Sequence, residues 1–286
     1  MTTDTTTSAA APVAPSVPLQ PVTDSEYLKR MQTAVDNAEQ TLAVADAAAA
    51  DPVASIAQKL SLSVVIPVYN ERRTIVDIVR RVQAAGVADE IIIVDDYSMD
   101  GTRTLLLELA KEPGIRVEMH GYNRGKGAAL RTGFAHASSD LVMVQDADLE
   151  YDPADVPKLL AAFDDQTDVV YGSRFLENAE QDPSWLHRFG NRVLTAASNL
   201  TTGQKLTDME TCYKVFRREL IQSLDIEQNR FGFEPEITAK IARRGTLIRE
   251  LPISYQCRGY DEGKKIGVRD ALNAFWCIFK YGVLRR

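Results

Sequence analysis

The chain has 286 residues, of which 45% are hydrophobic and 26% charged, as in an ordinary soluble globular protein with one large or two small domains. The net charge of −7 is uneven, because residues 241–286 are rich in lysine and arginine, which suggests an anionic partner near that end. The longest apolar run near the C-terminus, residues 274–279, is far too short to span a bilayer, so we expect no transmembrane segment. The three cysteines are an odd number without metal-like spacing, which favours a reduced, cytoplasmic compartment.

The first sixty residues differ from the rest of the chain. Residues 1–22 consist mainly of Thr, Ala, Pro and Ser and have too little apolar surface to fold, so they predict a disordered tail. Residues 25–50 have apolar side chains near helical spacing and predict a helix. We therefore expect residues 1–60 to form a tail and a helix that carry no catalytic group.

From Leu62 onward, short β-branched runs alternate with amphipathic segments. This alternation predicts an α/β fold with a mostly parallel sheet flanked by helices on both faces. Ligands in such folds bind at the carboxyl ends of the strands. We expect strands at residues 63–68, 91–95, 115–119, 141–145 and 168–172, and helices at about 71–85, 101–112, 126–137 and 153–164.

The first two predicted strands end in aromatic and acidic residues. Pro67, Tyr69 and Glu71 follow the first strand, where a dehydrogenase would have a G-x-G-x-x-G turn. The ring of Tyr69 can stack on a nucleobase. Asp95 and Asp96 end the second strand, where a carboxylate can accept from a base or a ribose hydroxyl.

The third strand is followed by the sequence NRGKG, residues 123–127. Its glycines allow close approach of the backbone, and Arg124 and Lys126 stand at a predicted helix start, a combination that favours phosphate binding. The spacing does not match a Walker A loop. Taken alone, this segment is a weak signal.

The fourth strand ends in the turn Asp146–Ala147–Asp148, followed by Glu150. Two carboxylates two residues apart repel each other unless a cation lies between them, and their hard oxygens suit Mg²⁺ or Mn²⁺. Such a cation neutralises a departing diphosphate. A lone D-x-D is common by chance, but this one follows three other suggestive strand ends in order.

Taken together, these segments resemble the family 2 glycosyltransferases, which have the Rossmann-like GT-A fold. Over about residues 62–281 the chain looks most similar to dolichol- and polyprenyl-phosphate mannose or glucose synthases. The resemblance implies that Glu150 joins Asp146 and Asp148 at the metal, where many relatives have Gln in place of Glu150. It implies a nucleotide-sugar site that includes Pro67, Tyr69, Glu71, Asp96, Lys126, Asp146 and Ala147.

The second half of the chain supports the resemblance to dolichol- and polyprenyl-phosphate sugar synthases. We expect residues 61–286 to form one GT-A domain whose acceptor side begins near residue 175, with residues 208–216 closing the acceptor site. The catalytic residues implied are Asp148, Arg174 and Asp208. The cations implied to hold an acceptor phosphate are Arg174, Arg188, Arg258 and Lys264.

The expected function is therefore inverting transfer of a sugar from GDP-mannose or a UDP-hexose to polyprenyl or dolichyl phosphate at a membrane surface, as in cell-envelope glycan synthesis. Residues 268–281 fit either a helix at the cytoplasmic face of a membrane or a buried core helix.

Two alternatives remain open at this point. A sugar or protein hydroxyl would need a general base, for which Asp208 and Glu210 are candidates. A non-catalytic nucleotide-sugar-binding module would share the fold. A nucleotidyltransferase is disfavoured by the missing glycine-rich loop, nucleic-acid binding has no recognisable module, and the oligomeric state is not predicted.

Overall fold

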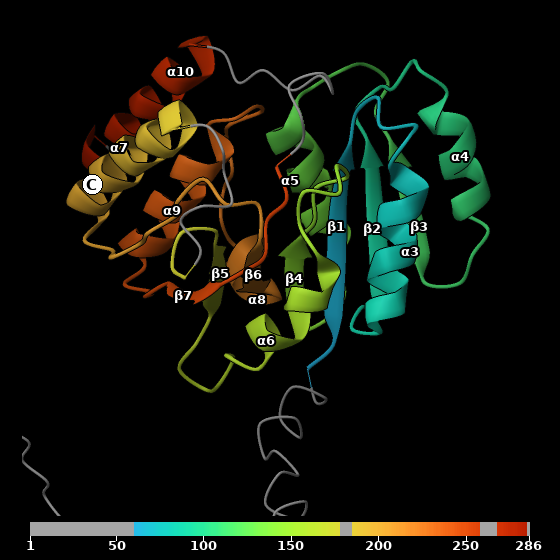
Figure 1. Ribbon diagram of the computed structural model, residues 1–286, viewed down its shortest axis with the longest axis horizontal. Coiled ribbons are helices and arrows are strands. Elements are labelled where there is room, and N and C mark those ends of the chain that lie inside the picture. Colours follow the sequence, from blue (N-terminus) through green and yellow to red (C-terminus); the bar gives the residue numbers. More distant parts are fainter. Residues whose placement is uncertain (1–59, 178–184, 258–267, 285–286) are drawn as a thin grey trace, which may run out of the picture. The chain divides into compact units, whose positions relative to one another are not determined.

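The computed structural model describes residues 60–177, 185–257 and 268–284, without the side chains of residues 185–187 and 268–270 (Figure 1). The tail and helix expected before residue 50 lie outside this part of the chain. So do Arg258 and Lys264, two of the expected phosphate-binding cations. No described helix combines the length and the apolar character needed to cross a bilayer.

Seven strands form one sheet in the order β3-β2-β1-β4-β6-β5-β7. Neighbouring strands run parallel except at β6, which is antiparallel to both β4 and β5. The expected mostly parallel sheet is confirmed. The strands are β1 (Leu62–Val68), β2 (Glu90–Asp95), β3 (Ile115–Met119), β4 (Leu141–Val144), β5 (Val169–Ser173), β6 (Lys214–Arg217) and β7 (Arg249–Pro252).

The central strands are apolar on both faces because helices cover both faces. β1 and β4 are buried almost throughout. The chain moves outward from β1 to β3 and then returns past β1 to β4. Right-handed crossovers therefore place α5 on the face opposite α3 and α4. These helices are α3 (Ile75–Ala85), α4 (Thr102–Leu109) and α5 (Lys126–His136), and a 3₁₀ turn η1 (Pro153–Asp155) leads into α6 (Val156–Leu160).

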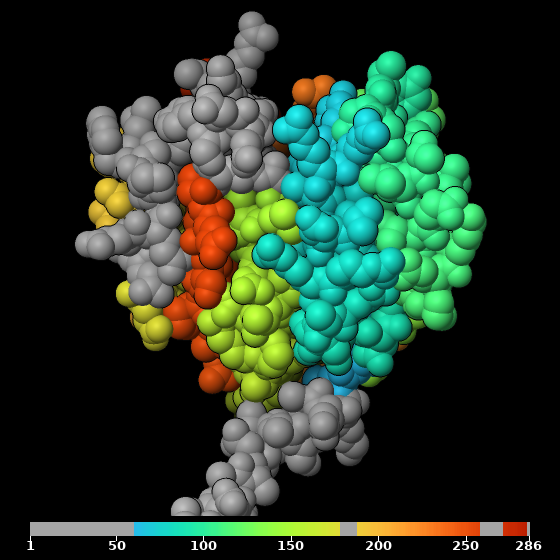
Figure 2. Space-filling view, turned by 45° about the vertical axis from the view of Figure 1, so that its right-hand side comes forward, coloured from blue at the N-terminus to red at the C-terminus, as the bar shows by residue number. Residues whose placement is uncertain are grey.

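The second half adds a group of helices beside the β7 end of the sheet (Figure 1). α7, α9 and α10 pack against one another there, and a π-helical turn, η3, continues α10. Figure 2 shows the segment after β7, in orange, lying beside the segment after β4, in yellow-green. The bounds are α7 (Trp185–Thr202), α8 (Arg218–Gln222), α9 (Phe233–Arg243), α10 (Val268–Phe279) and η3 (Lys280–Leu284).

Candidate active site

Backbone strain is concentrated at the carboxyl edge of the central strands. Within the described residues, three non-glycine residues have positive φ: Asn70 (57°), Tyr97 (72°) and Leu149 (61°). They follow the ends of β1, β2 and β4, three neighbouring strands. Asparagine adopts left-handed backbone readily, but for Tyr97 and Leu149 it costs about 1–2 kcal/mol, a strain that is found mainly at functional sites. The strain therefore marks the same edge that the sequence motifs indicate.

The two acids at the end of β2, Asp95 and Asp96, are buried and accept hydrogen bonds from within the protein. Asp95 accepts from the backbone N–H groups of Tyr97 and Ser98 and from Nε of Arg103, at 2.6 Å. The Asp96 carboxylate is 2% exposed. It accepts from the N–H groups of Arg124 (2.8 Å) and Gly125 (2.6 Å) and bonds to Nδ1 of His120 (2.8 Å). Asp96 thus holds the two backbone N–H groups that lead into α5.

The two glycines of the NRGKG segment serve packing against a distant loop. A Cβ on Gly125 would lie 2.3 Å from the carbonyl oxygen of Asn229, and one on Gly127 would lie 2.3 Å from that of Gln228. Asn229 also accepts the N–H of Ala128 (3.2 Å) in the first turn of α5. These glycines therefore let the loop before α9 pack on the start of α5.

Lys126 lies between two carboxylates from different parts of the chain. Its Nζ is 2.8 Å from Oδ1 and 3.1 Å from Oδ2 of Asp146, and 3.5 Å from Oε1 of Glu234 at the start of α9. Burial disfavours the ammonium, but Asp146 and then Glu234 outweigh it and hold the pKa of Lys126 well above its usual value. Lys126 is therefore charged where it lies beside the acidic turn.

The acidic turn has the donor chemistry for a hard divalent cation. Asp146 and Asp148 are 8% and 3% exposed, and they supply carboxylate oxygens. Glu150 accepts from the hydroxyl of Tyr255 (3.0 Å). No three acidic, His or Cys side chains of the described residues converge as a protein-only metal site requires. One or two carboxylates, completed by waters and a substrate phosphate, are the ligands typical of Mg²⁺, so the residues present fit that cation or Mn²⁺.

Arg174, after β5, is held rigidly by Asp208. Its Nε and Nη2 donate to the two oxygens of Asp208 at 2.7 and 2.8 Å, and its backbone N–H donates to Oδ2 at 3.1 Å. The guanidinium also lies 5.1 Å from the ring centre of Tyr255. Despite burial, Asp208 keeps the pKa of Arg174 well above its usual value. Asp208, fully buried, accepts additionally from Nδ2 of Asn191 (3.2 Å).

A second group of buried charges adjoins these pairs. The ammonium of Lys214, 1% exposed, donates to the carbonyl oxygens of Met209 (3.0 Å) and Thr211. Burial, and after it the negative charge of Glu234, raises the pKa of Glu210 to about 8. Oε1 of Glu210 and Oε2 of Glu234 are buried without a hydrogen-bond partner among the described residues. The region behind the acidic turn thus retains unused acceptor capacity.

The other predicted site residues that the structure describes lie at or just after the end of β1 and on α7. Pro67 pairs with the β2 strand, and Tyr69 is half exposed at the end of β1, as a base-stacking ring would need to be. Oε2 of Glu71 accepts from the hydroxyl of Thr74 (2.8 Å) at the start of α3. Arg188 lies on α7, three residues before Asn191. The roles of these residues in binding stay predictions.

Sequence reasoning missed four residues that the structure brings to this edge. His120 and Tyr255 contact predicted site residues, and Glu234 and Lys214 are buried ions. The FEPE segment at the start of α9 could have drawn attention, because two acids in an apolar helix turn are unusual. The other three carry no local signal.

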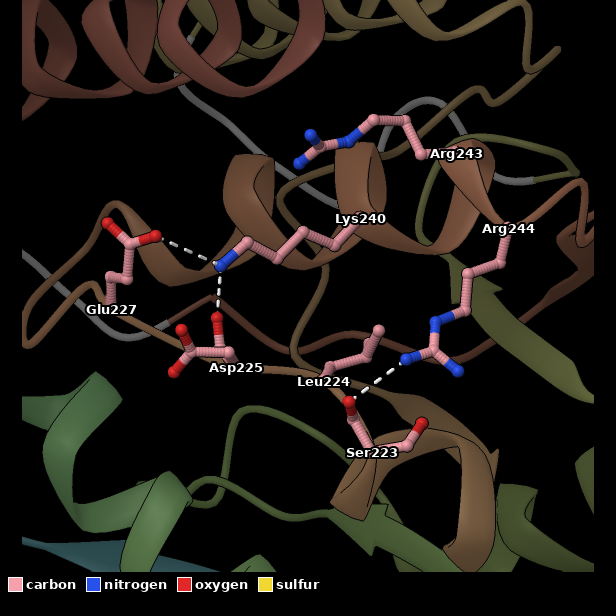
Figure 3. Close-up of a pocket in the computed structure, with 7 residues that line it drawn as sticks. All are labelled: Ser223, Leu224, Asp225, Glu227, Lys240, Arg243 and Arg244. Carbon is pink, nitrogen blue, oxygen red and sulfur yellow. Dashed lines mark hydrogen bonds and ion pairs between the residues drawn. The ribbon is translucent and has the colours of Figure 1, made fainter. Parts of the chain in front are cut away.

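A pocket farther along α9 is separate from the acidic turn (Figure 3). Two of its cations, Lys240 and Arg244, already have partners among the residues that line it. Lys240 lies 3.5 Å from Glu227 and also donates to the backbone of Asp225, and Arg244 donates to the carbonyl oxygen of Ser223 (2.9 Å). None of the predicted site residues lines it.

Curated relatives share the central part of the chain. An undecaprenyl-phosphate 4-deoxy-4-formamido-L-arabinose transferase of Edwardsiella ictaluri is 34% identical over 209 residues, which is 71% of this chain and 62% of the relative. The transferase of the same name from Enterobacter sp. is 32% identical over the same shares. The chain thus spans about three fifths of the length of these relatives.

Solved structures share the fold. The glucosyl-3-phosphoglycerate synthase of Mycobacterium tuberculosis, in complex with Mn²⁺, UDP and glucosyl-3-phosphoglycerate, superposes with a TM-score of 0.61 at 21% identity. The similarity covers 80% of this chain and 82% of that one. The same enzyme with Mn²⁺ and UDP-glucose gives 0.62 at 21% identity, over 80% and 82% of the two chains. This likeness confirms the expected GT-A fold. The sequence profile described as "Glycosyl transferase family 2" matches residues 63–225, and the chain belongs to that family.

Proposed function

We propose that this chain is an inverting glycosyltransferase that moves a sugar from a nucleotide sugar to the phosphate of a polyprenyl lipid at the cytoplasmic face of a membrane. An oxygen of the acceptor phosphate attacks the anomeric carbon while the bond to the donor diphosphate breaks, and the nucleoside diphosphate leaves. The names of the relatives that share a third of their aligned residues with this chain support this acceptor.

The observation that carries the choice of acceptor is the Arg174–Asp208 pair. A hydroxyl acceptor needs a general base, and Asp208 is the base that the sequence offers. Its two oxygens are instead held by the Arg174 guanidinium, at 2.7 and 2.8 Å, and it is fully buried. A lipid phosphate is already anionic and needs a fixed cation rather than a base, which Arg174 supplies.

The other residues of the edge have roles consistent with this reaction. In the proposal, Tyr69 stacks on the base, and Asp146 and Asp148 hold Mg²⁺ or Mn²⁺. When bound, the cation neutralises charge on the diphosphate as it departs. Arg174, fixed by Asp208 and the ring of Tyr255, holds the acceptor phosphate without having to reorganise during the reaction.

The test of this function is a transfer assay with a panel of GDP- and UDP-sugars, undecaprenyl phosphate in detergent, and Mn²⁺ or Mg²⁺. Asp148→Asn removes one of the two carboxylates that would hold the cation, and it is expected to lower the rate of sugar transfer by at least about 100-fold. The matched control is Asp152→Asn, because Asp152 caps η1 by accepting from Ala154 N–H, and Asn caps equally well. Transfer to the lipid that persists in Asp148→Asn would contradict the metal assignment. Donor hydrolysis without a lipid product would contradict the acceptor.

The membrane part of the proposal rests on an apolar surface of α10 and η3. One side of α10 is buried, including Cys277 and Ile278, while the other exposes large apolar groups. The rings of Trp276 and Phe279 lie 6.2 Å apart on it. α7, which packs against α10, also exposes large apolar side chains. The exposed members are Phe189, Val193, Leu200, Leu272, Phe275, Trp276, Phe279 and Val283. Such a surface suits the boundary of a bilayer.

Sedimentation with vesicles tests this surface. Wild-type protein is expected to sediment with vesicles that contain anionic lipid, and Trp276→Ser is expected to reduce the bound fraction several-fold, because a large half-exposed ring is lost. Leu247→Ser is the control, since Leu247 is also exposed but lies before β7, outside the surface. Equal sedimentation of the wild type and Trp276→Ser would contradict a membrane role for α10.

A further inference from the structure

Glu234 has no place in the proposed reaction, although it is one of the most buried acids near the acidic turn. It is 5% exposed and lies in the first turn of α9, about ninety residues from Asp146 along the chain. Its Oε1 lies 3.5 Å from Nζ of Lys126. An ionised carboxylate is rarely buried without pairing, so its position beside Lys126 calls for an explanation.

Lys126 occupies the side of Asp146 that a cation would use. Its Nζ is within 3.1 Å of both carboxylate oxygens, and it neutralises the charge of Asp146. A divalent cation on Asp146 would lie close to the ammonium and repel it, and it would compete with the ammonium for these oxygens. Since the ammonium is buried, it needs another anionic partner if it is to leave.

Glu234 is placed to be that partner. Lys126 already lies near Oε1, and Oε2 is buried without a hydrogen-bond partner among the described residues. A shift of the flexible lysine side chain by about 1 Å would turn the 3.5 Å contact into a hydrogen bond. The buried ammonium would then remain paired throughout.

We propose that Glu234 is a positioning residue that receives Lys126 when a divalent cation and a diphosphate take Asp146. Lys126 thus holds the acidic turn together before the donor binds, and it does not oppose the cation afterwards. The inference rests on the proposed function, because it requires a cation at the Asp146–Asp148 turn. It assigns to α9, outside the segment matched by the family profile, a part in donor binding.

The second glutamate of α9 provides a matched control. Glu236 is fully buried two residues away, but its oxygens accept from the backbone N–H groups of Glu227 (2.8 Å) and Gln228 (2.7 Å) and from Lys240 (2.6 Å). It has no contact with Lys126. Glu234→Gln and Glu236→Gln therefore remove the same charge from the same helix, and only the first removes the second partner of Lys126.

The experiment is a titration of the full chain with Mn²⁺, alone and with UDP or GDP, followed by the electron paramagnetic resonance signal of free Mn²⁺. Glu234→Gln is expected to weaken Mn²⁺ binding about tenfold, because Lys126 then has no alternative to Asp146. Lys126→Met should strengthen binding of Mn²⁺ alone. Glu234→Asp, which keeps the charge, should restore part of the affinity, and Glu236→Gln should leave it unchanged.

A double-mutant cycle decides whether Glu234 acts through Lys126. In the Lys126→Met background, Glu234→Gln should have little further effect on Mn²⁺ affinity. An equal loss in both backgrounds would show that Glu234 acts only by its own charge, and wild-type affinity in Glu234→Gln would show no role; either result overturns the inference. Absence of Mn²⁺ binding by the folded wild type would instead contradict the metal in the proposed function. Urea unfolding of each variant verifies that the compared proteins are folded.

Discussion

The acids after β2 and the acids after β4 look alike in sequence, yet the structure uses them in opposite ways. Asp95 and Asp96 are satisfied by backbone N–H groups, by His120 and by Arg103. Asp146 is neutralised by a side chain, Lys126, that could move away. Behind the second group, buried oxygens of Glu210 and Glu234 have no hydrogen-bond partner among the described residues.

This difference distinguishes acids that hold the backbone from acids at the proposed metal site, while a role of Asp96 in nucleotide binding stays a prediction. Carboxylates that accept several fixed N–H groups stabilise the fold and gain little from a ligand. Glu210 and Glu234 instead each have a buried oxygen without a donor among the described residues, so their charge destabilises the folded protein. Neutralising Asp95 or Asp96 should therefore lower stability, whereas neutralising Glu210 should raise it.

Asp96→Asn tests the acids that hold the backbone and has the larger expected effect. The amide removes the charge that attracts the N–H groups of Arg124 and Gly125 and turns an NH₂ group toward one of them. We expect a loss of about 3–5 kcal/mol in the free energy of unfolding, because a buried charged acceptor is lost while its donors remain. Urea denaturation measures it.

The control for this variant is Asp165→Asn, since Asp165 is exposed in the turn before β5 and its neutralisation should leave stability within about 0.5 kcal/mol. A loss below about 1 kcal/mol in Asp96→Asn would mean that this carboxylate does not hold the start of α5. The comparison between the two strand ends would then fail for the acids that hold the backbone.

Much of the first half of the fold follows from the sequence, because β1, β2 and β4 are apolar runs that a sheet covered on both faces can bury, and β3 alternates apolar and charged residues. β3 begins and ends at the predicted residues, and β1 begins only one residue earlier. The strands β6 and β7 were not predicted. β6 has four residues and begins with a buried lysine, Lys214, and β7 carries charged residues and is partly exposed. Neither has the apolar pattern that identifies a strand.

The position of a candidate site residue was predictable where it lies at the end of one recognisable strand, and not where it depends on contact between distant segments. The acidic turn and Arg174 stand at strand ends that the sequence identifies. The partner of Gly125 is Asn229, about a hundred residues away, so the glycines suggested a phosphate when they in fact face a protein loop. Glu234 likewise gains its meaning from Lys126, which only the folded chain brings near.

Glu210→Gln tests the other group of acids, with a smaller effect of opposite sign. Burial, and then Glu234, raises the pKa of Glu210 to about 8 in the folded chain, above the ordinary value of 4.5. Below pH 4.5 both folded and unfolded chains hold this proton. Between about pH 4.5 and 8 the unfolded chain releases it and the folded chain retains it, so stability falls as pH rises, by at most about 1.4 kcal/mol per pH unit. The glutamine variant lacks this loss and should be more stable than the wild type by at least about 1 kcal/mol at pH 8, with the difference shrinking toward pH 5. Urea denaturation at pH 5, 6, 7 and 8 measures this difference in stability, with Glu219→Gln, exposed on α8, as the control.

Parallel curves of stability against pH for Glu210→Gln and the wild type would mean that Glu210 does not titrate in this range. Glu210 would then be as well supplied with hydrogen-bond donors as Asp95 and Asp96, and the comparison between the two groups of acids would fail.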